Sequence, residues 1–300
     1  VPSEEAEGSY VMVPDTLPAP RGTERELDLV EMFAEDEDVI AYAADGFGDV
    51  SWSNDIGPGS RRHYESRGSA PLPCISGSAR ADVSTVAFKQ SNAHLPRELP
   101  VTPEFGWVVG FYIAEGSARR KQVQFVNRNV SYLERVEDWF DEFEGSLSWN
   151  DRGNGVHSLT VCSALWSRVF RDLAGEGGEK TIPARAWNWS DEVLEALLDG
   201  LLDGDGSRRE TRNTLFTANP DLANDVMYLA TRLGRLNSAY SREREVYIEP
   251  SDLECESLEW AVDMREGAHK QGQYVPVPAD LLRDLRERAD MRMIDAAEVI

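Results

Sequence analysis

Lysine is scarce in this chain of 300 residues, while carboxylates are abundant. The 31 basic residues include four lysines, so 27 are arginines, and they face 54 Asp and Glu residues at a formal net charge of −23. Taken alone, this charge argues against a nucleic-acid partner, because phosphate binding needs Lys and Arg. In molar salt, however, repulsion between charges is screened within roughly 3 Å. We therefore interpret the charge as an adaptation to high salt rather than that of an ordinary acidic cytosolic protein, and it leaves room for a local basic face.

Cysteine is also rare, and long apolar runs are missing. The three cysteines, Cys74, Cys162 and Cys255, form no CxxC or Cys/His spacing, so neither a zinc site nor a disulfide framework is expected. No run of 18 apolar residues exists, which excludes a membrane-spanning helix. The first residues, VPSEEAEGSY, lack the basic and apolar regions of a signal peptide. We expect a cytoplasmic protein with reduced thiols and no membrane partner.

The first hundred residues show little periodicity. Residues 1–22 are rich in Pro, Glu and Gly and are typical of a linker. Residues 24–44 favour a short amphipathic helix followed by a strand, and residues 45–100 predict irregular structure. A basic run at residues 59–63 is expected to be a solvated loop, with phosphate contact as the alternative. We therefore treat residues 1–100 as an N-terminal linker or accessory region.

From residue 101 the pattern becomes regular and then repeats. Thr102-Pro103-Glu104 is a helix start, and Ser190-Asp191-Glu192 is another about 90 residues later. Each start precedes an apolar helix, a strand, an amphipathic helix and further strands, which indicates an internal duplication. We place the two repeats at residues 101–187 and 188–250, and a partial C-terminal helical module at residues 251–300.

Small residues mark one face of each apolar helix. Gly110 and Ala114 in the first, like Gly200 and Gly204 in the second, are four residues apart and share a face. Two such faces pack closely, which places both helix ends side by side. Each end carries a carboxylate, Glu115 or Asp205. Because two carboxylates at negative helix ends repel each other, we expect a compensating cation, and oxygen ligands suit Mg²⁺.

The segments that end in these carboxylates, Val108–Gly116 and Leu198–Gly206, resemble the paired motifs of LAGLIDADG homing endonucleases. Two further stretches strengthen the resemblance. Glu179–Pro183 resembles the Lys-x-Ile-Pro element that precedes the second motif in intein-borne members. Tyr228–Gly234 resembles the Leu-Gly-ending helix that follows it. The four elements stand in the family's order and span about half of the chain.

The resemblance implies an α+β fold, a duplicated αββαββα arrangement with pseudo-twofold symmetry and a saddle-shaped sheet along the DNA major groove. It implies a monomer with an internal pseudo-dimer that cleaves both strands of a double-stranded DNA target with one to three Mg²⁺ ions. The expected catalytic residues are Glu115, Asp205, Lys180 and Lys270, and the expected metal ligands are Glu115, Asp205, Gly116 and Gly206. For Lys270 the simpler alternative is a surface lysine, and for Asp203 we favour a turn cap over contact with metal-bound water.

Basic and amide side chains follow both motifs, where the family's strands enter the groove. Arg suits bidentate contacts to guanine or phosphate, and Gln suits adenine. For any single arginine the alternative is a salt bridge on an acidic surface. The expected DNA-binding residues are Arg119, Arg120, Lys121, Gln122, Gln124, Arg208, Arg209, Arg212, Arg242 and Arg244.

Members with these four elements usually reside in inteins, so we expect the endonuclease part of an intein in a haloarchaeal host protein. The chain begins at Val1, ends at Ile300 and contains no His-Asn pair. Splicing chemistry is therefore not expected in these residues, and the chain is either an intein fragment or a free-standing relative. Two other functions compete with cleavage. One is a DNA-binding regulator or decayed protein of the same fold, and the other is an acidic interaction protein, which leaves the duplication unexplained.

Overall fold

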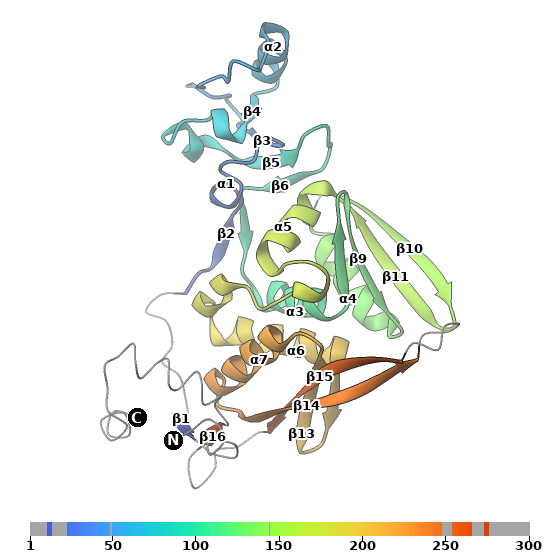
Figure 1. Ribbon diagram of the computed structural model, residues 1–300. Coiled ribbons are helices and arrows are strands. Elements are labelled where there is room, and N and C mark those ends of the chain that lie inside the picture. The colour runs from blue at the N-terminus through green and yellow to red at the C-terminus, as the bar shows by residue number, and fades with distance from the viewer. Residues whose placement is uncertain are drawn as a thin grey trace. The chain divides into compact units, whose positions relative to one another are not determined.

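The computed structural model describes residues 11–13, 23–48, 50–143, 145–247, 254–265 and 273–275 (Figure 1). The chain divides into two compact units, which we describe separately. The first unit is Gly22–Gly204, and the second combines Val1–Arg21 with Asp205–Ile300. Helices and antiparallel sheets occur in both, so the predicted α+β class is confirmed. Within the described ranges, no helix has the length and apolar character needed to cross a membrane.

The first unit begins with an N-terminal module, residues 23–100, which is regular rather than irregular. Our expectation for residues 45–100 is wrong, because they contribute three strands to a four-stranded sheet of order β4-β3-β5-β6. A further pair joins β2 to β7. The elements are β2 (Glu26–Asp28), α1 (Leu29–Met32), β3 (Val39–Tyr42), α2 (Pro58–Ser66), β4 (Ser69–Pro71), β5 (Thr85–Phe88), β6 (His94–Pro96) and β7 (Glu98–Pro100).

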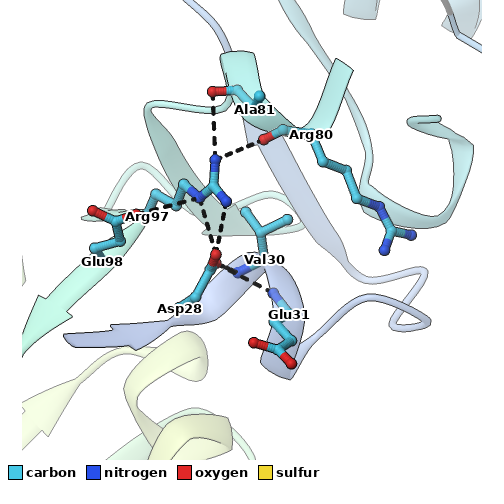
Figure 2. Close-up of polar contacts among 7 residues, drawn as sticks. All are labelled: Asp28, Val30, Glu31, Arg80, Ala81, Arg97 and Glu98. Atoms are coloured by element: carbon cyan, nitrogen blue, oxygen red, sulfur yellow. Dashed lines mark hydrogen bonds and ion pairs between the residues drawn. The ribbon is translucent and has the colours of Figure 1, made fainter. Parts of the chain in front are cut away.

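An ion pair ties this module together (Figure 2). The Asp28 carboxylate accepts hydrogen bonds from the Val30 and Glu31 amides at 2.8 and 3.3 Å, which caps α1. Arg97 donates to the same carboxylate at 2.7 and 3.2 Å, and to carbonyl oxygens of the 3₁₀ turn η3 (Ala79–Asp82). Burial raises the pKa of Asp28, but the bonds from Arg97 and the two amides outweigh it and leave that pKa below its ordinary value.

The first repeat follows in the same unit. Its sheet has the order β10-β11-β9-β8, and its three helices pack on one face, where Val123, Phe125, Leu159 and Val161 are buried. Two of its strands form a hairpin, with positive φ at Asn154 and Gly155 in the turn. The elements are α3 (Pro103–Glu115), β8 (Gly116–Arg119), β9 (Gln122–Asn127), α4 (Val130–Phe140), β10 (Ser146–Gly153), β11 (Val156–Cys162) and α5 (Ala164–Ala174).

The second repeat replays this topology. It begins with α6 (Asp191–Asp205), which ends at the boundary between the units, and its sheet has the order β12-β13-β15-β14. The first two strands lie 90 residues after their counterparts, so Phe125 of the first repeat corresponds to Leu215 of the second. The elements in the second unit are β12 (Gly206–Arg209), β13 (Arg212–Thr217), α7 (Pro220–Arg232), β14 (Leu236–Tyr247) and β15 (Glu254–Arg265), with a separate pair of β1 (Val11–Val13) and β16 (Gln273–Val275).

The end of the second repeat corrects our domain boundary. We expected the repeat to stop at residue 250, but β15 pairs with both β13 and β14 and completes the sheet. The periodic signal was too weak to reveal this strand. Lys270 and residues 276–300 of the expected C-terminal helical module lie outside the described residues.

Candidate active site and nucleic-acid interface

Two helices of the first unit approach each other through glycine. A methyl group on Gly110 of α3 would lie 2.0 Å from the carbonyl oxygen of Leu197 in α6. One on Gly200 would lie 2.1 Å from the carbonyl oxygen of Trp107, and one on Gly204 would lie 2.3 Å from Ala114 Cβ. Real Cβ atoms do not tolerate such distances, so the two backbones touch where any side chain would separate them. The four small residues singled out from the sequence thus meet in the structure.

This packing brings the last turn of α6 to the Glu115 side chain. A Cβ on Gly204 would lie 3.0 Å from Glu115 Cγ, and Asp205 is the next residue and the last of α6. Glu115 is likewise the last residue of α3. Each carboxylate therefore ends its own helix, at the end where the helix dipole is negative.

Asn127 holds the Glu115 carboxylate. Its amide nitrogen donates to Glu115 Oε1 at 2.7 Å, while its own Oδ1 accepts from the Asn129 backbone amide at 2.8 Å. Because Oδ1 is already used as an acceptor, the NH₂ group must face Glu115. Position 127 lies at the end of β9, and its equivalent in the second repeat is Thr217. We did not predict this contact from the sequence, since the strand register that creates it is not visible there.

Lys180 lies at the C-terminal end of α3, although 64 residues separate it from Gly116. Its ammonium group donates to the carbonyl oxygens of Gly116 at 2.7 Å and Tyr112 at 3.0 Å, and it lies 5.3 Å from the centre of the Tyr112 ring. The negative end of the helix dipole stabilises a cation at this place. The structure therefore places the lysine of the Lys-x-Ile-Pro stretch directly beside the Glu115-Gly116 segment.

Asp203 has two partners that we did not anticipate. Its carboxylate accepts from the indole nitrogen of Trp107 at 2.9 Å and from the hydroxyl of Tyr132 at 3.4 Å. It therefore links α6 to α3 and α4 inside the first unit, a role beside which the turn cap stays a prediction. The equivalent residue of the first repeat is the buried Ile113, so the two repeats differ here.

The donor types that the sequence predicted fit a hard divalent cation. The first unit supplies the Glu115 carboxylate and the Gly116 carbonyl oxygen; Asp205 and Gly206, the other predicted ligands, belong to the second unit and offer the same kinds of oxygen. The Gly116 carbonyl already accepts from Lys180, but a carbonyl oxygen has a second lone pair. The described residues contain no cluster of three or more His, Cys, Asp or Glu side chains placed to hold a metal, and a site of two carboxylates falls below that number.

The first sheet has an open face without carboxylates. The strand registers place on it Ser117, Arg119, Gln122, Gln124, Val126, Ser148, Asn150 and Thr160, together with Ser158, which its neighbours bury. None of these described positions is Asp or Glu, in a chain with 54 such residues. Gln124 donates to Thr160 Oγ1 at 3.0 Å and accepts from Arg152 at 2.7 Å. Amide and hydroxyl groups arranged in this way match the hydrogen-bonding edges of bases.

The remaining predicted DNA-binding residues are placed unequally. Arg119, Arg120 and Lys121 are exposed at the turn between β8 and β9. In the second sheet Arg209 and Arg212 are register partners and share a face, whereas Arg208 alternates to the opposite face. The backbones of Arg242 and Arg244 lie in β14, paired with Glu259 and Ser257, and their side chains are outside the described ones.

Residues 192–259, from α6 into β15, match the LAGLIDADG-like domain family. The matched region holds Asp205 and the second repeat, while α3 and Glu115 lie before it.

Curated relatives of this chain are much longer archaeal proteins. The DNA polymerase II large subunit of Thermococcus kodakarensis is 25% identical over 74% of this chain and 13% of its own length. The ATP-dependent DNA helicase Hel308 of the same organism is 28% identical over 48% of this chain and 14% of its own. The DNA-directed RNA polymerase subunit Rpo1C of Methanocaldococcus jannaschii is 23% identical over 43% of this chain and 16% of its own. The chain thus matches a small part of each relative.

Solved structures similar to this one include I-DmoI in complex with DNA and Ca, with 13% identity and a TM-score of 0.41 over 55% of this chain and 83% of that one. I-DmoI is a homing endonuclease. Full-length DUF199/WhiA from Thermatoga maritima has 9% identity and a TM-score of 0.35, over 62% and 60% of the two chains.

Proposed function

We propose that this protein is a site-specific DNA endonuclease that cleaves both strands with the help of a divalent cation. The close packing of α3 and α6 through Gly110, Gly200 and Gly204 carries the proposal. It fixes the helix end that bears Glu115 against the residue before Asp205. Two neighbouring carboxylates repel each other unless a cation lies between them, and the LAGLIDADG-like match supports this use of the motif.

The chain's own residues take distinct roles in this proposal. Glu115 and Asp205 hold the cation, for which we propose Mg²⁺, together with the carbonyl oxygens of Gly116 and Gly206. Asn127 orients the Glu115 carboxylate toward the cation. Lys180, at the end of α3, supplies positive charge for the scissile phosphate. When bound, the cation supplies Lewis-acid activation of water and of the leaving oxygen. The carboxylate-free face of the first sheet and the arginines of the second contact the DNA.

The relatives favour an inserted element as the genetic setting. A DNA polymerase, a DNA helicase and an RNA polymerase carry names for different activities, yet each matches this chain over a small part of its length. A segment shared by such proteins is not required by any of the named activities. An intein inserted into different host genes explains this pattern, and the acidic, lysine-poor composition favours a haloarchaeal host. Among the site residues, we propose Lys270 as the counterpart of Lys180 in the second repeat.

The decisive experiment compares Glu115→Gln and Asp205→Asn with the parent chain. The substrate is a supercoiled plasmid with the uninterrupted host-gene junction, with Mg²⁺ and molar KCl. We expect the parent to linearise the plasmid and both variants to lose linearisation while still binding the junction. Glu134→Gln and Asp138→Asn, at exposed positions of α4, are matched controls that should cut like the parent. Cleavage by both active-site variants at the parental rate would refute the assignment.

A DNA-binding protein without cleavage is the second candidate. The polar face of the first sheet favours it, because amide and hydroxyl groups serve recognition whether or not a strand is cut. A parent chain that binds the junction tightly and never cuts it, with Mg²⁺ or Mn²⁺, would decide for this function.

A further inference from the structure

Three arginines form a row across the second sheet. Arg209 of β12 pairs with Arg212 of β13, and the register of β13 with β15, continued by one residue beyond Asn213 and Met264, sets Arg265 beside Arg212. Residues directly opposite in neighbouring strands point to the same face, and neighbouring strands are about 4.8 Å apart. The three guanidinium groups therefore project side by side from one face of the sheet.

Such a row is unfavourable by itself. Like charges directly opposite each other destabilise a sheet, and this chain has 54 Asp and Glu residues that could offset them. Yet in the part of the chain that the structure describes, no carboxylate pairs with Arg209 or Arg265. Both side chains are exposed. Two exposed arginines that an acidic protein leaves without a carboxylate point to an anion from outside.

One arginine of the row is held in place. Arg212 donates to the Asp263 carboxylate at 3.1 Å, and Thr214 donates to the other oxygen of the same carboxylate at 2.6 Å. Asp263 is 8% exposed, so this anchor is built into the sheet. The single carboxylate offsets one of the three positive charges and orients Arg212, and the row remains positive.

The row borders an open cavity of about 300 Å³, lined by Arg209, Thr211, Arg212 and Arg265. The cavity is large enough for a tetrahedral anion, and its lining offers guanidinium forks and one hydroxyl. Arginine forks match phosphate oxygens in geometry as well as in charge. None of the four lining residues that the structure describes is a large apolar or aromatic side chain that would stack on a base.

We infer that this cavity, the arginine-row pocket, binds one backbone phosphate of the DNA, with Arg265 and Thr211 as contacts that the sequence motifs did not indicate. This inference rests on the proposed function, because it assumes a DNA partner. Contacts of this kind fix the register of a protein on the duplex and carry no base specificity. The pocket thus positions the second sheet, whereas the polar face of the first sheet reads bases.

The test measures duplex binding by fluorescence anisotropy over a range of KCl concentrations. Arg265→Gln should weaken binding to target and unrelated duplexes by the same factor, and lower the slope of log K against log[KCl] by about 1. Arg265→Lys keeps the charge and should keep the slope. Arg25→Gln, at an exposed arginine of the N-terminal module, removes equal charge elsewhere and should leave the slope unchanged. Circular dichroism confirms that the variants are folded.

Duplexes with a single neutral methylphosphonate, placed at one position after another, identify the contacted phosphate. At that position the neutral linkage and Arg265→Gln should not have additive effects. If the parent binds duplexes but Arg265→Gln keeps its affinity and slope, this inference fails and the proposed function stands. If inorganic phosphate occupies the pocket while every methylphosphonate duplex binds normally, the site is for a free anion and the inference fails. If the parent binds no duplex at all, the proposed function fails, and this inference with it.

Discussion

Asn127 donates a hydrogen bond to Glu115 and thereby helps to orient its carboxylate. Its amide faces the carboxylate because its oxygen is committed to the Asn129 amide. We expect Asn127→Ala to keep DNA binding and to lower the cleavage rate about 10-fold to 100-fold, since a group that orients a metal ligand typically contributes that much. The measurement is the cleavage rate as a function of Mg²⁺ concentration.

Two further substitutions of Asn127 distinguish the effect of its hydrogen bond on Glu115 from the effect of its side-chain volume. Asn127→Asp places a second negative charge beside Glu115 and should slow cleavage more than Asn127→Ala does. Asn127→Thr copies Thr217 of the second repeat and should fall between Ala and the parent. A Mg²⁺ titration of Asn127→Ala that superimposes on that of the parent would show that the hydrogen bond has no role in metal binding.

The Asp28–Arg97 pair predicts a pH-dependent contribution to stability. The folded-state pKa of Asp28 lies below its ordinary value, so the pair stabilises the fold above about pH 3.9 and loses this effect as the pH falls through the folded pKa. Asp28→Asn keeps the helix cap and removes the charge. It should lower the free energy of unfolding by about 1 kcal/mol at pH 7, given that the pair is partly exposed.

Urea unfolding of parent and Asp28→Asn between pH 7 and pH 3 checks this prediction. The difference between the two proteins should shrink toward the acid end of the range. Asp28→Ala also removes the cap and should cost about 1 kcal/mol more than Asp28→Asn at every pH. A difference between parent and Asp28→Asn that stays constant with pH would contradict the ion-pair explanation.

Among elements, the α3–α6 pair depends most strictly on its sequence. Gly200→Ala places a methyl group 2.1 Å from the Trp107 carbonyl oxygen, and the helices must move apart. We expect a loss of about 1–3 kcal/mol from this overpacking. Gly59→Ala is the matched control, because Gly59 is also helical and has nothing within 4 Å of the added methyl group. It should stabilise the protein by about 0.5–1 kcal/mol. Thermal unfolding of both variants tests the difference in sign.

The elements that could be predicted are those with a long local signal. The apolar run from Phe105 to Ala114 and the cap at Thr102 define α3 without tertiary information, and the hairpin at Asn154-Gly155 is marked by its turn residues. The N-terminal module escaped prediction because its strands have three or four residues, too few to show alternation. β4, β6 and β7 even contain proline, which usually argues against a strand.

The same distinction between local and long-range signals applies to the candidate site. The spacing of Gly110, Ala114, Gly200 and Gly204 is a property of single helices, so it could be read from the sequence. Contacts between distant segments could not: Asn127 meets Glu115 through the register of β8 with β9, and Asp203 reaches Trp107 through the packing of two helices. Lys180 was accessible because the family resemblance, not its local pattern, singled it out.

On the scale of the whole molecule, the two repeats share a topology but not their polar details. Glu115 has Asn127 beside it, and the equivalent of Asn127 is Thr217; Asp203 bonds to Trp107, and its equivalent is Ile113. The open face of the first sheet presents mainly uncharged polar groups beside Arg119, and the second sheet presents the arginine row. A duplicated protein with unequal halves suits an asymmetric DNA site, in which each half meets a different sequence.

The charge of the whole chain leads to a prediction about salt. If the excess of carboxylates is an adaptation to molar salt, the melting temperature should rise as KCl is increased into the molar range, because screening removes repulsion between exposed carboxylates. Glu134 and Asp138 offer a local test, since they are exposed, of like charge and one turn apart on α4. Glu134→Gln with Asp138→Asn should stabilise the protein by about 0.2–0.5 kcal/mol in low salt and by nothing measurable in molar KCl. A melting temperature that does not change with KCl in the parent would instead indicate an ordinary acidic protein, and the DNA contacts would then operate at low salt, where phosphate binding is strongest.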